Sequence, residues 1–247
     1  MQDRFKLGDV FVTRTNKNDA SVRMARFVAD RKLGYICFMD ARTAYLANHD
    51  AEYCRIQNNS LMTMPDGMPL VWFAHRNGFA DVERVSGKDF MDMVFSVSVR
   101  EGYSHYFYGS TPDTIAKIQE ILARVYTGIS VLGAVSPPFQ PLDAFDVDAL
   151  ARELNQLKPT FFWCGLGAPK QERLIAMLQP KLDMTFCAGV GLAFEYLAGT
   201  VRRAPRWMQN SGFEWLFRLA QQPRNIARIA KPFLWIVKEL LVTNMKK

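Results

Sequence analysis

Residues 160–172 read TFFWCGLGAPKQE, an apolar run that ends in a glycine turn and leads into a proline. The run over 160–164 is short and rich in aromatic residues, which favours a buried β-strand. Proline is common in the first turn of a helix, so the residues that follow predict a helix over 169–178. A strand, a glycine turn and a helix in this order are typical of a parallel α/β sheet.

The same alternation continues on both sides of this stretch. We expect further strands over 34–39, 61–64, 105–109, 129–133 and 184–188. We expect a helix over 112–126, because a cap residue and then Pro112 stand at its start, and a helix over 146–157, because apolar residues recur there at helical spacing. The sequence therefore predicts an α/β fold, a Rossmann-like and mainly parallel sheet with helices on both faces.

The excess positive charge of the chain lies in its last fifth. Residues 196–247 contain ten Lys or Arg and two Glu, whereas the net charge of all 247 residues is +7. We therefore divide the chain into an α/β domain over 1–195 and a basic helical C-terminal appendage over 196–247. Such a field attracts an anionic partner: a membrane surface, a phosphorylated substrate or a nucleic acid.

Residues 226–241 predict a basic amphipathic helix that is bent at Pro232. Such a helix either docks on its own core or at a dimer contact, or it lies on a membrane surface. Periodicity alone leaves these readings even, and the arginines upstream favour an anionic surface.

Several function classes are not expected. The four cysteines and three histidines are dispersed without metal-ligand spacing, so we expect reduced thiols and no metal site. The N-terminus has no apolar signal region, and no stretch has the roughly 20 apolar residues that span a bilayer. No cofactor is expected.

Asp66 and Gly67 follow the predicted strand over 61–64. Loops beyond the carboxyl ends of parallel strands are where ligands bind, so Asp66 is a candidate general base toward a substrate hydroxyl. The alternative, which is more common for such a residue, is that Asp66 caps a helix or makes a turn.

Two glycine turns follow later strands. In the first turn, Gly165 and Gly167 let the backbone approach a ligand, and Lys170, Gln171 and Glu172 follow at a helix start that suits a phosphate. The second turn contains Gly189 and Gly191. Together they indicate neighbouring loops that frame a cleft, although each could be a tight turn without a ligand.

A group of basic residues lies in the appendage. Its candidate phosphate ligands are Arg202, Arg203, Arg218, Arg224 and Arg228. The planar guanidinium pairs with two phosphate oxygens at once. The alternative is a solvated positive face, and the aromatic residues between the arginines leave open a nucleic-acid interface.

These motifs, taken in order, resemble the bacterial glycosyltransferase family named for the enterobacterial common antigen, wall teichoic acid and capsule enzymes, the WecG/TagA/CpsF family. The resemblance covers about residues 20–235. It rests on the segments 65–67, 84–89, 108–110, 165–172, 189–191, 202–205 and 212–219.

The resemblance implies an inverting, metal-independent transferase. It would use a nucleotide sugar, with UDP expected, and a polyprenyl-diphosphate-linked sugar as acceptor, in surface polysaccharide biosynthesis. Asp66 matches the proposed base, and Arg84 and Gln171 match residues that line the site. The appendage would close over the pocket and bind the membrane or the lipid diphosphate.

One departure from the family pattern affects the sugar. Asp40 ends the segment Phe38-Met39-Asp40, where the family often has Thr-x-Asn, so a carboxylate is expected near the donor sugar. The full predicted set is Asp66 as catalytic residue, and Asp40, Gly67, Arg84, Gly109, Gly165, Gly167, Lys170, Gln171, Glu172, Gly189, Gly191, Arg202, Arg203, Arg218, Arg224 and Arg228 as substrate-binding residues.

The expected location is the cytoplasmic face of the inner membrane, as a peripheral protein held through the appendage. The expected partners are the donor, the lipid-linked acceptor and anionic lipid, with no nucleic acid and a possible homo-oligomer. The alternative in another class is a non-catalytic module that binds a membrane surface. A nucleic-acid-binding protein is a third, weaker interpretation.

Overall fold

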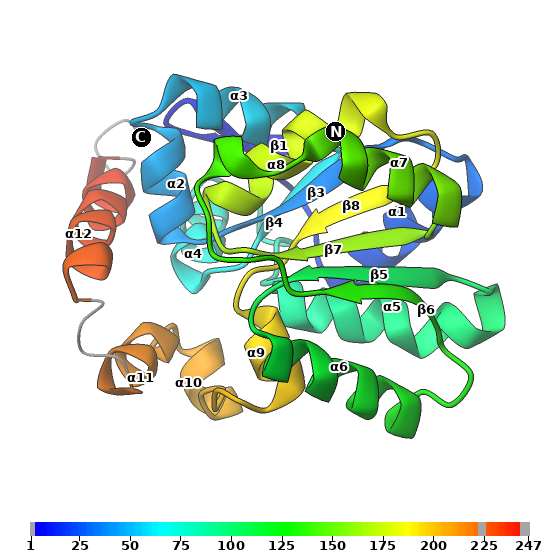
Figure 1. The fold of residues 1–247 in the computed structure, drawn as a ribbon. Coiled ribbons are helices and arrows are strands. Elements are labelled where there is room, and N and C mark those ends of the chain that lie inside the picture. Colours follow the sequence, from blue (N-terminus) through cyan, green and yellow to red (C-terminus); the bar gives the residue numbers. More distant parts are fainter. Residues whose placement is uncertain (1–2, 222–225, 243–247) are drawn as a thin grey trace. The chain divides into compact units, whose positions relative to one another are not determined.

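The computed structural model describes residues 3–221 and 226–242 (Figure 1). The strands are β1 Arg4–Leu7, β2 Val10–Thr13, β3 Gly34–Met39, β4 Met62–Pro65, β5 Ser104–Gly109, β6 Ser130–Val135, β7 Phe161–Gly165 and β8 Phe186–Gly189. The helices are α1 Lys17–Ala29, α2 Ala41–Ala47, α3 Ala51–Asn59, α4 Met68–Arg76, α5 Gly87–Glu101, α6 Pro112–Val125, α7 Val147–Leu157, α8 Lys170–Leu178, α9 Ala193–Ala198, α10 Arg206–Asn210, α11 Glu214–Gln221 and α12 Ile226–Val242. Short 3-10 turns lie at Leu142–Ala144 and Gln179–Lys181.

The sheet confirms the predicted α/β class. Within the described residues, its strand order is β4-β3-β8-β7-β5-β6, and β1 and β2 form a separate antiparallel hairpin. The pairs β3–β8, β8–β7, β7–β5 and β5–β6 are all parallel. All six predicted strands are present, and their ends lie within two residues of the prediction.

The chain forms two compact units. The first unit comprises residues 1–17, 38–86 and 203–247, and the second comprises residues 18–37 and 87–202. The expected division into a catalytic α/β domain over 1–195 and an appendage over 196–247 that binds membrane or substrate stays a prediction.

The first unit contains a hairpin that the sequence analysis did not predict. In β1 and β2 the residues alternate between buried and more exposed positions, and Phe5 and Val12 are almost fully buried. These side chains join a core that also contains Leu70 of α4 and Ile236 of α12. The hairpin therefore supplies one wall of the core on which the C-terminal helix packs.

Helix α12 confirms the predicted helix over 226–241, with Pro232 inside it. The helix packs on α2 and α4, where Ile236 is fully buried and the Trp235 ring meets the edge of Tyr45 at 6.2 Å between centroids. Leu234, by contrast, keeps 68% of its surface exposed. The helix is thus docked on its own unit, while part of its apolar stripe still faces solvent.

The second unit is built around strands β5–β8. Helices α7 and α8 pack together on one side of these strands, and α5, α6 and α9 lie on the other (Figure 1). The central side chain is Trp163, fully buried, whose Nε1 donates to Nδ1 of His105 at 3.0 Å. His105 is therefore a core residue held by hydrogen bonds, and burial lowers its pKa to about 3.

The cysteines agree with the expectation of reduced core residues. All four are free thiols, and Cys37, Cys164 and Cys187 are buried, whereas Cys54 is half-buried. Burial raises the pKa of Cys187 to about 12, which leaves a neutral thiol of low reactivity.

Candidate active site

Asp66 lies directly after β4, at the carboxyl end of the strand. Its backbone N–H donates to Met39 O at the end of β3, at 2.8 Å, which fixes the residue at this edge. The N-cap of α4 is Gly67, without a side-chain hydrogen bond, so the Asp66 carboxylate does not cap that helix. The helix-cap alternative therefore does not apply, whereas the turn alternative stays open, because Asp66 and Gly67 form the connection between β4 and α4.

Gly67, next to Asp66, lets the backbone pack closely against a second acidic residue, Asp40. A Cβ on Gly67 would lie 3.4 Å from Cα of Asp40, so the two backbones pack tightly here. Asp40 is the N-cap of α2, and its Oδ1 accepts from N and Oγ1 of Thr43 at 2.8 and 2.9 Å. The structure gives Asp40 a capping role next to Asp66, and its contact with a sugar stays a prediction.

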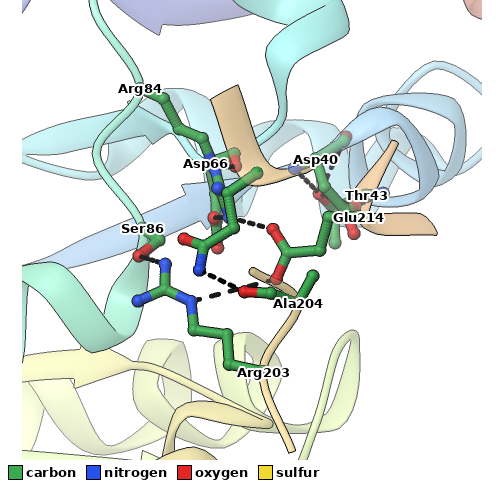
Figure 2. Close-up of polar contacts among 9 residues, drawn as sticks. Asp40, Thr43, Asp66, Arg84, Ser86, Arg203, Ala204 and Glu214 are labelled. Carbon is green, nitrogen blue, oxygen red and sulfur yellow. Dashed lines mark hydrogen bonds and ion pairs between the residues drawn. The ribbon is translucent and has the colours of Figure 1, made fainter. Parts of the chain in front are cut away.

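Arg84 joins Asp66 to a residue far along the chain. Its Nε donates to Asp66 O at 2.5 Å, and its Nη2 lies 3.4 Å from Asp66 Oδ1. The same Nη2 donates to Oε2 of Glu214, at the start of α11, at 2.5 Å (Figure 2). Arg84 therefore lies next to Asp66, and a third residue takes part in the contact, while the predicted role of Arg84 in substrate binding stays a prediction.

Arg203 approaches Glu214 from another direction. Its Nη2 donates to Oγ of Ser86 at 2.9 Å, and its Nε lies 3.9 Å from Oε1 of Glu214 (Figure 2). The segment that carries Arg203 is held by Gln209, whose Nε2 donates to Ala204 O at 2.7 Å. Two guanidinium groups thus flank the carboxylates of Asp66 and Glu214 in the first unit.

Glu214 is a site residue that the sequence analysis missed. Its side chain is 15% exposed and holds two arginines of the first unit. A signal was available, because Glu214 is one of only two acids among residues 196–247. A lone acid in a strongly basic segment is a candidate for an internal ion pair.

The surroundings of Asp66 raise its pKa to about 6. Enclosure by protein is the main cause, and the carboxylates of Asp40 and Glu214 add to it, whereas Arg84 and Arg203 oppose it. The side chain nevertheless keeps 29% of its surface exposed. A carboxylate with such a pKa that remains accessible suits a general base near neutral pH.

Glycines converge at the carboxyl ends of three strands in the second unit. Gly109 of β5 pairs with Gly165 of β7, and Cys164 pairs with Gly189 of β8. After β5 the chain continues to β6 on one side, and after β7 it continues to β8 on the other. Such a switch point in a parallel sheet is a common place for nucleotide binding.

Gln171 ties the two predicted glycine turns together. Its Oε1 accepts from Gly167 N at 3.1 Å, and a Cβ on Gly189 would lie 3.1 Å from its Cγ. Its Nε2 donates to Oε1 of Glu172 at 2.8 Å. Gln171 and Glu172 are 4% and 1% exposed, so both hold the turns from within, and direct ligand contact by them stays a prediction.

Lys170 connects helix α8 to the loop that follows β6. Its Nζ donates to Gln140 O at 2.7 Å and lies 4.9 Å from the centroid of the Phe139 ring. The side chain of Phe139 is fully exposed. Lys170 therefore has partners within the second unit, and its predicted contact with a phosphate stays a prediction.

The remaining predicted arginines are less defined. Arg202 is an exposed residue of the second unit. Arg224 lies outside the described residues, and for Arg218 and Arg228 only the helical backbone is described. Their predicted role as phosphate ligands stays a prediction.

Over residues 3–221 and 226–242, no group of three or more His, Cys, Asp or Glu side chains is arranged to hold a metal ion. In the same part of the chain, no helix has the length and apolar character that crossing a membrane requires.

Comparison with known proteins agrees with the resemblance seen in the motifs. The chain is 25% identical over 214 residues to the N-acetylglucosaminyldiphosphoundecaprenol N-acetyl-beta-D-mannosaminyltransferase of Bacillus subtilis (strain 168), and the match covers 85% of this chain and 82% of the relative. The model of the glycosyl transferase WecG/TagA/CpsF family matches residues 5–246. The protein is therefore a glycosyltransferase and belongs to the WecG/TagA/CpsF family.

Proposed function

We propose that this protein is an inverting, metal-independent transferase that moves a sugar from a UDP sugar to a polyprenyl-diphosphate-linked sugar. The Bacillus relative supports this acceptor class, because its name describes an enzyme that acts on an N-acetylglucosaminyl-diphospho-undecaprenol. The pathway is surface polysaccharide assembly.

The observation that carries the proposal is the state of Asp66. Its carboxylate stands at a strand end with a pKa of about 6 and an accessible side chain, next to the Arg84 guanidinium. At neutral pH the carboxylate is ionised, and it is a stronger base than an ordinary surface aspartate.

The proposed step is a single displacement. Asp66 takes the proton of an acceptor hydroxyl, and the oxygen forms a bond to the anomeric carbon of the donor sugar. The bond from that carbon to the diphosphate oxygen breaks, and its electron pair leaves with UDP. Attack from the face opposite the leaving group inverts the anomeric centre.

The leaving diphosphate needs positive charge and N–H donors. In this proposal Arg84 and Arg203, which both contact Glu214 in the first unit, supply the cationic charge. Arginine can offset this charge without a metal ion.

The proposed location is the cytoplasmic face of the inner membrane, where the protein is peripheral. The ten basic residues among 196–247 support contact with anionic lipid. On α12, the residues Lys231, Leu234, Lys238 and Leu241 are all exposed. Their spacing of three, four and three places basic and apolar side chains on one solvent-facing stripe, as an interfacial helix requires.

The test is a transfer assay with the purified protein. A panel of UDP sugars is offered with an N-acetylglucosaminyl-diphospho-polyprenol, with and without a chelator, and the anomeric configuration of the product is read by NMR. We expect transfer with inversion that survives the chelator. Asp66→Asn should lower kcat by about a thousandfold or more, whereas Asp81→Asn, which removes a surface carboxylate paired with Arg14, should not.

Retained turnover in Asp66→Asn would remove Asp66 as the base. Loss of activity with the chelator, restored by a metal, would overturn metal independence. Lipid binding without transfer from any donor would favour the alternative of a non-catalytic surface module.

A further inference from the structure

Two carboxylates of the first unit compete for one nitrogen atom. Arg84 Nη2 lies 2.5 Å from Glu214 Oε2 and 3.4 Å from Asp66 Oδ1. The closer contact therefore belongs to Glu214, and Asp66 receives only the longer one. Because a charge-assisted hydrogen bond weakens steeply with distance, Arg84 is mainly neutralised by Glu214.

Glu214 is itself held firmly in place. Its second oxygen, Oε1, lies 3.9 Å from Nε of Arg203, which in turn donates to Ser86. Only 15% of the Glu214 side chain is exposed, so solvent screens its charge weakly. The carboxylate is thus a fixed feature of the site.

We infer that Glu214 is a positioning residue for the transfer reaction: by taking the close contact with Arg84, it keeps that guanidinium from pairing tightly with Asp66 and leaves Asp66 free to accept a proton. This inference rests on the proposed role of Asp66 as the base. Glu214 acts through Arg84 and does not touch the reacting atoms.

The charged groups that face Asp66 give the direction of the effect. Arg84 and Arg203 lower the pKa of Asp66, and Asp40 and Glu214 raise it. Without the charge of Glu214, only Asp40 would oppose the two cations that act on Asp66, and Arg84 Nη2 would be left to Asp66. Both changes favour the ionised form of Asp66, which then becomes a weaker base.

The first experiment compares the pH dependence of kcat/KM in the wild type, Glu214→Gln and Glu214→Asp. In Glu214→Gln the acidic limb should move to lower pH by about one unit, and the plateau rate should fall roughly threefold because the base is weaker. Glu214→Asp keeps the charge and should hold the limb closer to its wild-type position. The matched control, Asp81→Asn, removes an exposed carboxylate of the same unit and should leave the limb in place.

A second experiment measures the pKa of Asp66 in the absence of turnover. The protein is labelled with ¹³C at the aspartate carboxyl groups and titrated by NMR, and the Asp66 signal is assigned by its loss in Asp66→Asn. The pKa of Asp66 should be lower in Glu214→Gln than in the wild type.

The outcomes separate this inference from the function it rests on. If the Asp66 pKa is the same in wild type and Glu214→Gln, the inference is wrong, even if the variant is slow. If the pKa falls but Asp66→Asn retains full transfer, the inference about charge stands and the base assignment fails. If Glu214→Gln does not fold, Glu214→Ala removes the same charge with a smaller side chain, and an Asp66 pKa in that variant equal to the wild-type value contradicts the inference.

Discussion

Gly109 and Gly165 stand opposite each other at the carboxyl ends of β5 and β7, so close that a Cβ on Gly109 would lie 2.6 Å from the carbonyl carbon of Gly165. The φ angle of Gly109 is also +129°, which side chains rarely permit. The contact is therefore one of backbone against backbone, with no flexible side chain that could move aside. The two strand ends are therefore packed directly against each other, and Gly109 is buried.

We predict that Gly109→Ala impairs both folding stability and nucleotide binding. The added methyl group forces the two strand ends apart and should lower the free energy of unfolding by about 2 kcal/mol or more. Gly102→Ala is the matched control, because Gly102 has a φ of +68° but no atom within 4 Å of its Cβ position. Urea unfolding and thermal shift with UDP measure the two effects. Equal losses in both variants would mean that the close approach at Gly109 is unimportant.

The raised pKa of Asp66 predicts that this residue destabilises the fold at neutral pH. The pKa is about 6 in the folded protein and 3.8 in the reference state, so folding favours the protonated form. The contribution of protonated Asp66 to the free energy of unfolding is fully present below pH 3.8 and is lost as the pH rises through 6. Asp66→Asn mimics the protonated form at every pH.

We therefore expect Asp66→Asn to match the wild type in stability at pH 4 and to exceed it by about 2 kcal/mol at pH 8. Urea unfolding at both values measures the difference. Asp81→Asn is the control. The hydrogen bond from Arg14 lowers the pKa of Asp81, so replacing this carboxylate should not raise the free energy of unfolding at pH 8. A wild type as stable as Asp66→Asn at pH 8 would contradict the raised pKa.

His105 predicts a loss of stability in acid. Burial lowers its pKa from 6.5 to about 3, so the folded state resists protonation. Its contribution is fully present above pH 6.5 and is lost as the pH falls from 6.5 toward 3. Relative to His105→Gln, which does not titrate, the wild type should lose about 2 kcal/mol between pH 7 and pH 5. His49→Gln, at an exposed position, is the control, and a slope unchanged by His105→Gln would refute the assignment.

Local patterns predicted the sheet because its strands are runs of aromatic and apolar residues bounded by glycine, proline or aspartate. The same approach missed the hairpin, whose two strands have four residues each and contain Lys6 at an exposed position. Its signal was the pair Gly8-Asp9 between two alternating runs, where Gly8 adopts a φ of +62°. The turn chemistry was present in the sequence, but the strands were too short to stand out.

The site was predictable only in part. Asp66 and the glycine turns follow strands directly, so the rule for parallel sheets locates them. The pairing of Arg84 with Glu214 joins residues 130 positions apart, and no local pattern encodes such a contact. Asp40 caps helix α2 through a local hydrogen bond from Thr43 N. The functional interpretation of Asp40 did not consider this cap.

Helix α12 offers a test that separates core packing from membrane contact. Ile236 is fully buried, whereas Leu234, two residues earlier, is 68% exposed on the stripe with Lys231 and Lys238. Ile236→Ala should therefore lower the free energy of unfolding by about 3 kcal/mol and leave the vesicle affinity of the folded protein unchanged. Leu234→Ala should leave stability unchanged and weaken binding to phosphatidylglycerol vesicles roughly tenfold. Urea unfolding and vesicle sedimentation measure the two quantities, with phosphatidylcholine vesicles as the neutral control. If Leu234→Ala binds anionic vesicles as tightly as the wild type, this stripe is not the surface that meets the lipid.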